Sequence, residues 1–272
     1  SRFAVRILPE LVFHGENVVE ELVLDVDYPD RITKILKILG KKNNNTLDWM
    51  GKVKRLELKD HAIKILPKLR FYEENVMEVL RLKALGPEYM AKILAAKNKS
   101  IRVGKVKRLV LSYHAVGILP KLKFHREDVL EELELEAYNS EHTTEILNTN
   151  DNSIGLGKAR KLGLCGYAME ILPKFNFHRE EVLEELVLSS MLIECTPEIF
   201  RMENNSIWVG KVRKMELNGY SVEMLPKLRI HQENVLEELV LSSTLIEYTP
   251  VIFRMENNSI RVGKVRKMEL NG

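Results

Sequence analysis

The sequence has little of what marks disulfide-rich, membrane-spanning or strongly nucleic-acid-binding proteins. Its 272 residues include only two cysteines, Cys165 and Cys195, which are too few for a disulfide scaffold. No apolar run approaches membrane-spanning length, so membrane insertion is not expected. The 42 basic and 39 acidic side chains leave a net charge of +3, so total charge alone indicates neither a nucleic-acid nor a membrane partner.

The scarcity of cysteine favours a reducing, intracellular (cytoplasmic) compartment. Secretion is the alternative, because the chain begins with Ser1-Arg2, without an initiator Met and part-way through a repeat. A content of 45% apolar and 30% charged residues predicts a soluble chain with a substantial core.

The chain is dominated by an internal repeat of 53 residues. The dipeptide Leu-Pro begins at Leu8, Leu66, Leu119, Leu172 and Leu225, and Gly-Lys begins at Gly51, Gly104, Gly157, Gly210 and Gly263. Fixed self-similarity at such a period is typical of stacked repeat proteins, in which each unit contacts only its neighbours. We therefore expect residues 1–272 to form a single array of about ten repeats, as a segment of a longer array or with its ends covered by a partner.

Each period contains two short segments with the pattern apolar-x-x-apolar-x-apolar, which predicts half-buried strands. Five of them, which we call Lys-type, centre on Leu56, Leu109, Leu162, Met215 and Met268. The five Glu-type segments centre on Leu22, Leu80, Leu133, Leu186 and Leu239. After a first step of 34 residues, from Leu22 to Leu56, the steps alternate between 24 residues, as from Leu56 to Leu80, and 29 residues, as from Leu80 to Leu109.

This tenfold x-x-L-x-L pattern resembles the leucine-rich repeat (LRR) family over the full length of the chain, as an atypical subfamily with alternating 24- and 29-residue repeats. The resemblance implies an α/β solenoid (horseshoe) with a parallel β-sheet on its concave face and short helices or 3₁₀ turns on its convex face. The family's usual turn asparagine is replaced, for example by His61, His114, Tyr167 and Tyr220. The turn must therefore satisfy its backbone groups in another way.

The connections between strands differ in kind. After a Lys-type strand comes an apolar stretch such as Val222–Leu228, whose Pro226 suits the first turn of a short helix or 3₁₀ turn. After a Glu-type strand the connections, such as Tyr89–Ala96 and Leu245–Met255, are longer and end in Asn-rich turns. Because asparagine tolerates left-handed backbone, these turns are interpreted as helix ends.

Charge alternates along one row of the expected sheet face. Arg55, Arg108, Lys161, Lys214 and Lys267 alternate with Glu21, Glu132, Glu185 and Glu238, and Val79 interrupts the row. Neighbouring strands lie about 4.8 Å apart, so these charges can pair across the sheet as a salt-bridge ladder. The functional alternative is a charged groove for an acidic partner or RNA, suggested by basic strand starts such as Lys52–Arg55, although the interleaved glutamates oppose it.

The positions beside this row vary from strand to strand and are the candidate partner contacts. They are Glu57, Arg81, Val110, Glu134, Val187, Glu216 and Val240, flanked by the charged residues Arg55, Arg108, Glu132, Lys161, Glu185, Lys214 and Glu238. The family resemblance implies a non-catalytic scaffold that binds another protein. The alternatives are an RNA- or ribonucleoprotein-associated factor that uses the basic strand starts, and an architectural or surface-coat repeat protein.

No pattern in the sequence indicates an active site, a cofactor or a metal centre, so we expect no enzyme. His14, His125, His178 and His231 repeat at the 53-residue period, two strands or about 10 Å apart. Zinc requires nitrogens about 2.0–2.1 Å away, so these histidines cannot share an ion and are interpreted as structural turn residues. The Gly-Lys turns precede strands rather than helices and lack phosphate-loop spacing.

Overall fold

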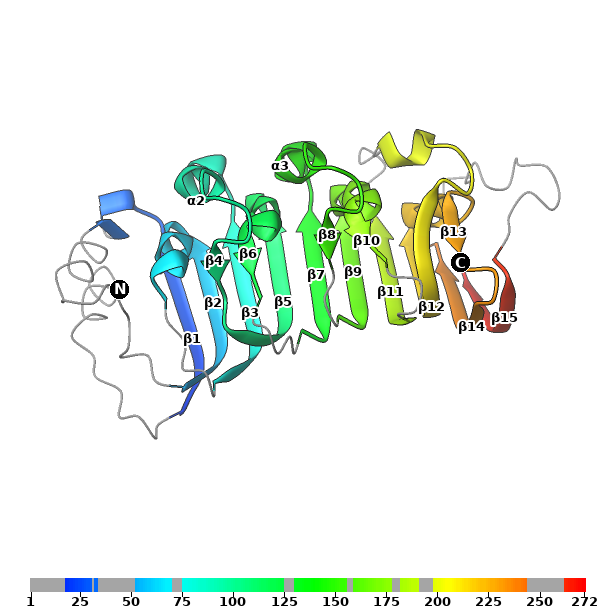
Figure 1. The fold of residues 1–272 in the computed structure, drawn as a ribbon, viewed down its shortest axis with the longest axis horizontal. Helices are drawn as coiled ribbons and strands as arrows, with labels where there is room; N and C mark the ends of the chain where they lie inside the picture. The colour runs from blue at the N-terminus through cyan, green and yellow to red at the C-terminus, as the bar shows by residue number, and fades with distance from the viewer. Residues whose placement is uncertain are drawn as a thin grey trace. The chain divides into compact units, whose positions relative to one another are not determined.

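The computed structural model describes residues 18–30, 32–33, 52–69, 75–124, 130–155, 159–177, 182–190, 198–243 and 262–272. The chain divides into two compact units, residues 1–130 and residues 131–272. Each unit is an α/β fold in which short helices pack on a parallel β-sheet (Figure 1). The predicted fold class is therefore confirmed at the level of parallel strands joined by short helical connections.

The first unit contains four long parallel strands in the order β1-β2-β3-β5. They are β1 (Val18–Val26), β2 (Lys52–Asp60), β3 (Val76–Ala84) and β5 (Lys105–Tyr113), and two short strands, β4 (Ile101–Arg102) and β6 (Leu122–Lys123), pair with each other. The predicted leucines share one register across the four long strands, namely Leu22, Leu56, Leu80 and Leu109. The repeat pattern thus predicted both the strands and their alignment.

The second unit contains six long parallel strands in the order β7-β9-β11-β12-β14-β15. They are β7 (Glu132–Ala137), β9 (Lys161–Gly166), β11 (Val182–Ser190), β12 (Ile207–Gly219), β14 (Val235–Ser242) and β15 (Lys264–Asn271). Short β13 (Leu228–Ile230) pairs with β12, and β8 (Ile154–Gly155) pairs with β10 (Phe175–Asn176). The central residues are again in one register: Leu133, Leu162, Leu186, Met215, Leu239 and Met268.

Side chains alternate between a buried and a more exposed face along each strand, as the period-two pattern predicts. Leu56, Leu80 and Leu186 are almost fully buried against the connecting segments, and their removal from water stabilises the layers at roughly 25 cal/mol per Å². On β15, by contrast, Met268 is 50% exposed and Leu270 is 70% exposed. Among the strands that the structure describes, β15 pairs with β14 alone.

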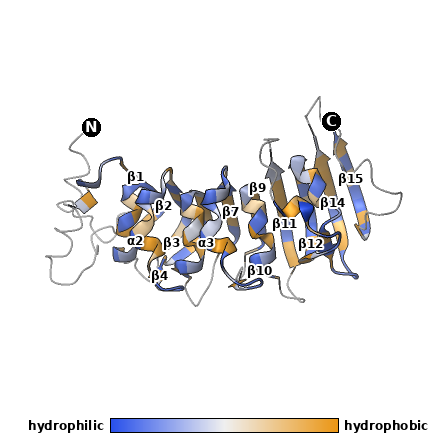
Figure 2. Cartoon of the chain, turned by 90° about the horizontal axis from the view of Figure 1, so that it is seen from above, coloured by the Kyte–Doolittle hydropathy of each residue, from blue (hydrophilic) through white to orange (hydrophobic). Residues whose placement is uncertain are grey.

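The connections after the Lys-type strands are 3₁₀ helices, as predicted. They are η3 (His61–Lys68), η5 (His114–Lys121), η7 (Tyr167–Lys174) and η9 (Tyr220–Met224). In Figure 2 the short helices carry hydrophobic and hydrophilic residues together, as expected for elements that pack on the sheet with one side. The expected proline position is wrong, because Pro67, Pro120 and Pro173 lie near the C-terminal end of their helices rather than in the first turn.

The proline position is explained by hydrogen bonds from the preceding connection. The backbone N–H groups of Lys99, Asn152 and Asn205 donate to the carbonyls of Pro120, Pro173 and Pro226 at 3.0, 3.1 and 2.9 Å. These three donors have left-handed φ angles of 55°, 55° and 59°, so the left-handed backbone expected of the Asn-rich turns is present. They lie four or five residues beyond the preceding short helices, which end at Leu94, Leu147 and Arg201, so the interpretation of these turns as helix ends is wrong. Since proline lacks an N–H but keeps its carbonyl, it serves at a position that only has to accept.

The connections after the Glu-type strands combine short helical pieces. The first unit has η4 (Pro87–Tyr89) and α2 (Ala91–Leu94), and the second has η6 (Ser140–His142), α3 (Thr144–Leu147) and η8 (Glu198–Arg201). The expected helix at Leu245–Met255 falls on residues outside the described ranges. None of the helices within the described part of the chain is long and apolar enough to cross a membrane.

The turns after the strands satisfy their backbone groups with varied side chains, as the missing turn asparagine requires. Asp60 Oδ1 accepts from the Leu85 N–H at 2.8 Å. His142 Nδ1 accepts from the N–H groups of Tyr138 and Asn139 at 3.2 and 3.3 Å. The Ser221 hydroxyl donates to the Leu188 carbonyl at 2.7 Å. Asp60 and His142 thus perform the same task with different residue types, since each accepts from the N–H of an equivalent turn residue, whereas Ser221 bonds a carbonyl within β11.

Candidate partner-binding face

The residues that point away from the helices form what we call the outer face of each sheet. In the second unit it consists of three rows that run across the strands. The charged row contains Glu132, Lys161, Glu185, Lys214, Glu238 and Lys267; the middle row contains Glu134, Gly163, Val187, Glu216, Val240 and Glu269; the third row contains Glu136, Cys165, Ser189, Asn218, Ser242 and Asn271. The register places every facing residue predicted for these strands on this face.

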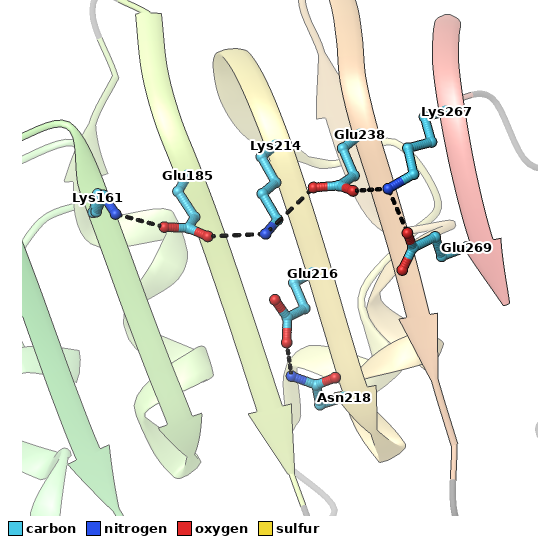
Figure 3. A network of polar contacts seen from close by, with 8 residues as sticks. All are labelled: Lys161, Glu185, Lys214, Glu216, Asn218, Glu238, Lys267 and Glu269. Atoms are coloured by element: carbon cyan, nitrogen blue, oxygen red, sulfur yellow. Dashed lines mark hydrogen bonds and ion pairs between the residues drawn. The ribbon is translucent and has the colours of Figure 1, made fainter. Parts of the chain in front are cut away.

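The charged row is an alternating ladder of ion pairs (Figure 3). Lys161 Nζ lies 3.0 Å from Glu185 Oε2, and Lys214 Nζ lies 3.5 Å from Glu185 Oε1 and 3.3 Å from Glu238 Oε2. Lys267 Nζ continues the row at 2.7 Å from Glu238 Oε1. The predicted salt-bridge ladder is therefore present in the second unit.

The ladder shifts the pKa values of its members in opposite directions. Partial burial opposes ionisation of Glu185, but hydrogen bonds and attraction from Lys161 and Lys214 outweigh it and hold the Glu185 pKa below its usual value. The hydrogen bond to Glu238, with the nearby Glu185 carboxylate, raises the pKa of Lys214 despite desolvation. Each partly exposed pair contributes roughly 0–1 kcal/mol, so the ladder neutralises and aligns the strands more than it stabilises them.

The same row in the first unit contains Glu21, Arg55, Val79 and Arg108 in one register. Here the cations pair with neighbouring positions as well. Arg55 Nη2 lies 3.4 Å from Glu78 Oε2, and Lys54 Nζ lies 2.8 Å from Glu20 Oε1. At the basic strand start Lys52–Arg55, which was proposed for RNA, the two adjacent strands therefore supply a carboxylate to two of the cations.

The middle row contains the candidate contacts, and their exposure differs. Glu57, Arg81, Val187 and Glu216 are partly or fully exposed, and Val23, which the sequence analysis did not single out, is 44% exposed in the same row. Val110 is only 1% exposed and Val240 only 9%. These two short, β-branched side chains stand beside longer residues, Arg81 for Val110 and Glu216 for Val240, so neither offers the contact surface expected of it.

A hollow of about 220 Å³ lies on the outer face of the second unit. It is centred on Gly163, and the outward-facing residues of β7, β9 and β11 line it. The other outward residues of the middle row carry side chains, so the missing side chain of Gly163 leaves the space open. Sequence comparison of the repeats carries this signal, because Gly163 aligns with Glu57, Val110, Glu216 and Glu269 at the 53-residue period.

Three of the described histidines, His61, His142 and His231, make local contacts typical of structural groups. His231 Nδ1 accepts from the Glu233 N–H at 3.2 Å, as expected of a turn residue. His61 is buried, its Nδ1 lies 2.6 Å from Lys64 Nζ, and burial lowers its pKa. His14, His125 and His178 lie outside the described ranges. His142, which anchors a turn, was missed because it does not repeat.

One acidic group offers metal-type ligand atoms. Carboxylate oxygens of Asp25, Asp27 and Asp60 lie within 4.8 Å of one another. Burial, followed by the two neighbouring carboxylates, raises the pKa of Asp60 against its hydrogen bond from Leu85. That bond gives Asp60 a structural role in its turn.

Comparison with known proteins supplies no relative for this chain. No family model, no curated protein and no solved structure matches it.

Proposed function

We propose that this chain is a leucine-rich-repeat-like scaffold that binds another protein through the outer face of its parallel sheets and performs no catalysis itself. The contacts are the variable middle row, above all Glu57, Arg81, Glu134, Val187 and Glu216. The charged row lies beside these contacts on the same face and keeps the strands aligned. Because backbone hydrogen bonds between the strands fix the sheet, such a face binds a partner with little loss of conformational entropy.

The observation that carries the proposal is how the cations of this face are used. Each ammonium group of the charged row in the second unit lies close to a carboxylate on a neighbouring strand. The shortest distance is 3.0 Å for Lys161, 3.3 Å for Lys214 and 2.7 Å for Lys267. A phosphate-tracking surface needs cations whose counterions can be released, and here protein carboxylates already neutralise them. A face of self-paired charges with partly exposed apolar side chains such as Val23 and Val187 favours a protein partner over RNA.

Two alternatives make different predictions. An RNA- or ribonucleoprotein-associated factor would bind through the basic strand starts, and its affinity would fall steeply as salt rises. An architectural or surface-coat protein would bind no separate partner through this face.

The test is affinity capture of a partner from the natural source by the immobilised full chain, with and without nuclease. The variants Glu216→Arg and Arg81→Glu change the middle row of one unit each. The control variant Glu203→Arg makes the same kind of change at an exposed position after η8, on the helical side. We expect at least one protein to be captured in a nuclease-resistant manner, and at least one middle-row variant to reduce its capture tenfold while the control retains it.

Capture that disappears with nuclease would overturn the proposal in favour of RNA. Equal capture by the middle-row variants and the control would place the binding surface elsewhere. Circular dichroism of each variant separates a lost contact from a lost fold.

A further inference from the structure

The hollow over Gly163 has a regular construction that bears on what it can hold. Three outward residues from each of three strands surround it as a grid with Gly163 in the centre. The grid consists of Glu132, Lys161 and Glu185, then Glu134, Gly163 and Val187, then Glu136, Cys165 and Ser189. The opening thus comes from one missing side chain on an otherwise continuous surface.

The size of the hollow limits its occupant. Its volume of about 220 Å³ is below the range of roughly 300–1,000 Å³ that is typical of pockets for drug-sized ligands. It suits one side chain from a partner. A pocket that accepts a single anchoring side chain is a common feature at the centre of protein interfaces.

The charge of the lining selects the kind of side chain. Four carboxylates line the hollow, from Glu132, Glu134, Glu136 and Glu185, against one ammonium, that of Lys161. Lys161 is already 3.0 Å from Glu185. An ionised carboxylate offers about four lone-pair sites, so carboxylates with existing contacts keep capacity for another donor.

The apolar part of the lining fits the same occupant. Val187 borders the hollow, and the backbone of Gly163 forms its centre, so an aliphatic stem finds apolar contact there. Lysine and arginine carry such a stem below a cationic head. We propose that the hollow over Gly163 is the anchor site for a lysine or arginine side chain of the bound protein; this inference rests on the proposed function.

The chain provides a variant that fills the hollow without damaging the strand. A Cβ built on Gly163 meets only Cγ of the Glu134 side chain, at 3.3 Å, and that side chain can move. Valine occupies the equivalent position at Val110 in β5. Gly163→Val should therefore fold normally while it closes the hollow.

The test uses short peptide probes and the ¹⁵N-labelled full chain. The probes are acetyl-Gly-Gly-Xaa-Gly-Gly-amide with lysine, arginine or norleucine at Xaa, titrated in the presence of a chelator. We expect the lysine and arginine probes to shift the amide resonance of Gly163 and its neighbours in a saturable manner. The norleucine probe, which keeps the stem and lacks the charge, should bind at least tenfold more weakly.

Two further variants separate charge from shape. Glu134→Gln keeps the hollow and removes one carboxylate, so the affinity for the lysine probe should fall about threefold. Glu216→Gly opens a similar gap in β12. The middle-row neighbours of this gap are Val187 and Val240, whereas those of Gly163 are Val187 and Glu134. Because the new gap lacks the glutamate, the variant should gain no affinity for the lysine probe.

The outcomes distinguish this inference from the proposed function. Loss of both the probe and the captured partner in Gly163→Val supports the inference. Equal probe binding by wild type and Gly163→Val overturns it, as does binding that appears only when a divalent metal replaces the chelator. If Gly163→Val loses the probe but captures the partner as wild type does, the anchor role is wrong, while the Glu216→Arg and Arg81→Glu variants still decide the proposed function.

Discussion

The Asn234 side chain makes two hydrogen bonds to the backbone of Val212, a residue 22 positions earlier. Its Oδ1 accepts from the Val212 N–H at 3.0 Å, and its Nδ2 donates to the Val212 carbonyl at 2.9 Å. Val212 lies just before the first paired residues of β12 and β14, Lys214 and Glu238. The side-chain amide of Asn234 therefore adds one more pair of hydrogen bonds between the two strands, just before their backbone pairing begins.

Asn234→Ala should lower the free energy of unfolding by about 2 kcal/mol or more, because two buried backbone groups lose a partner at about 1–3 kcal/mol each. Asn234→Asp keeps the acceptor and loses the donor, so its loss should be smaller. Aspartate and glutamate stand at the equivalent positions Asp128 and Glu181. Urea unfolding followed by circular dichroism measures both. Wild-type stability in Asn234→Ala would show that water replaces these bonds without cost.

Gly166 occupies a turn position that a side chain cannot enter without movement of the backbone. Its φ angle is +62°, and a Cβ there would lie 2.3 Å from the Ala137 carbonyl oxygen. Gly166→Ala should destabilise the protein by about 3 kcal/mol, because backbone strain and a backbone clash act together. The matched control is Gly155→Ala in β8, whose Cβ would meet nothing within 4 Å and should change stability by less than about 0.5 kcal/mol.

Asp60 and Tyr113 hold the same turn position with φ angles of 51° and 59°, so the turn can accommodate a Cβ where its surroundings have adjusted. If Gly166→Ala unfolded at the same urea concentration as Gly155→Ala, the backbone around Gly166 could move to accommodate a Cβ, as the turns at Asp60 and Tyr113 do. Equal midpoints would thus contradict the prediction.

The sequence predicted the parts of this fold that depend on period. The 53-residue repeat and the spacing of leucines were sufficient to align Leu56 with Leu80 and Lys214 with Glu238, because one register buries every leucine of a sheet at once. Features that depend on a single repeat were not predicted. The anchoring role of His142 and the hollow at Gly163 arise where one repeat differs from the others, and a search for shared pattern passes over such differences.

Burial of individual candidate contacts could not be predicted either. Alternation places Val110 and Val187 on the same face, yet Val110 is 1% exposed, whereas Val187 is partly exposed. How far a short side chain is covered depends on the lengths and rotamers of the residues around it. The proline position was missed for a similar reason, since its carbonyl partner belongs to a different connection.

Glu185 links two lysines, and its removal should have a pH-dependent effect. Because its pKa is lowered in the fold, its ionised form stabilises the protein at pH values above the ordinary glutamate range, and this contribution is lost as pH falls through its lowered pKa. Glu185→Gln should therefore lower stability by about 1 kcal/mol at pH 7 and by much less at pH 3. Urea midpoints at both pH values measure the difference. An equal loss at the two pH values would indicate a packing effect instead.

Glu170 should show the opposite sign. Its carboxylate is partly buried in η7 and accepts from the Glu198 N–H at 2.9 Å. Desolvation raises its pKa despite this hydrogen bond, so the ionised form is disfavoured in the fold. The resulting destabilisation is present at pH values above the raised pKa and disappears as pH falls below the ordinary range of glutamate. Glu170→Gln keeps an acceptor for Glu198 and removes the charge, so it should raise the urea midpoint at pH 7 and leave it unchanged at pH 3. The gain should be smaller than the loss expected for Asn234→Ala. A lower midpoint at pH 7 would mean that the charge-assisted hydrogen bond to η8 outweighs the cost of burying the carboxylate.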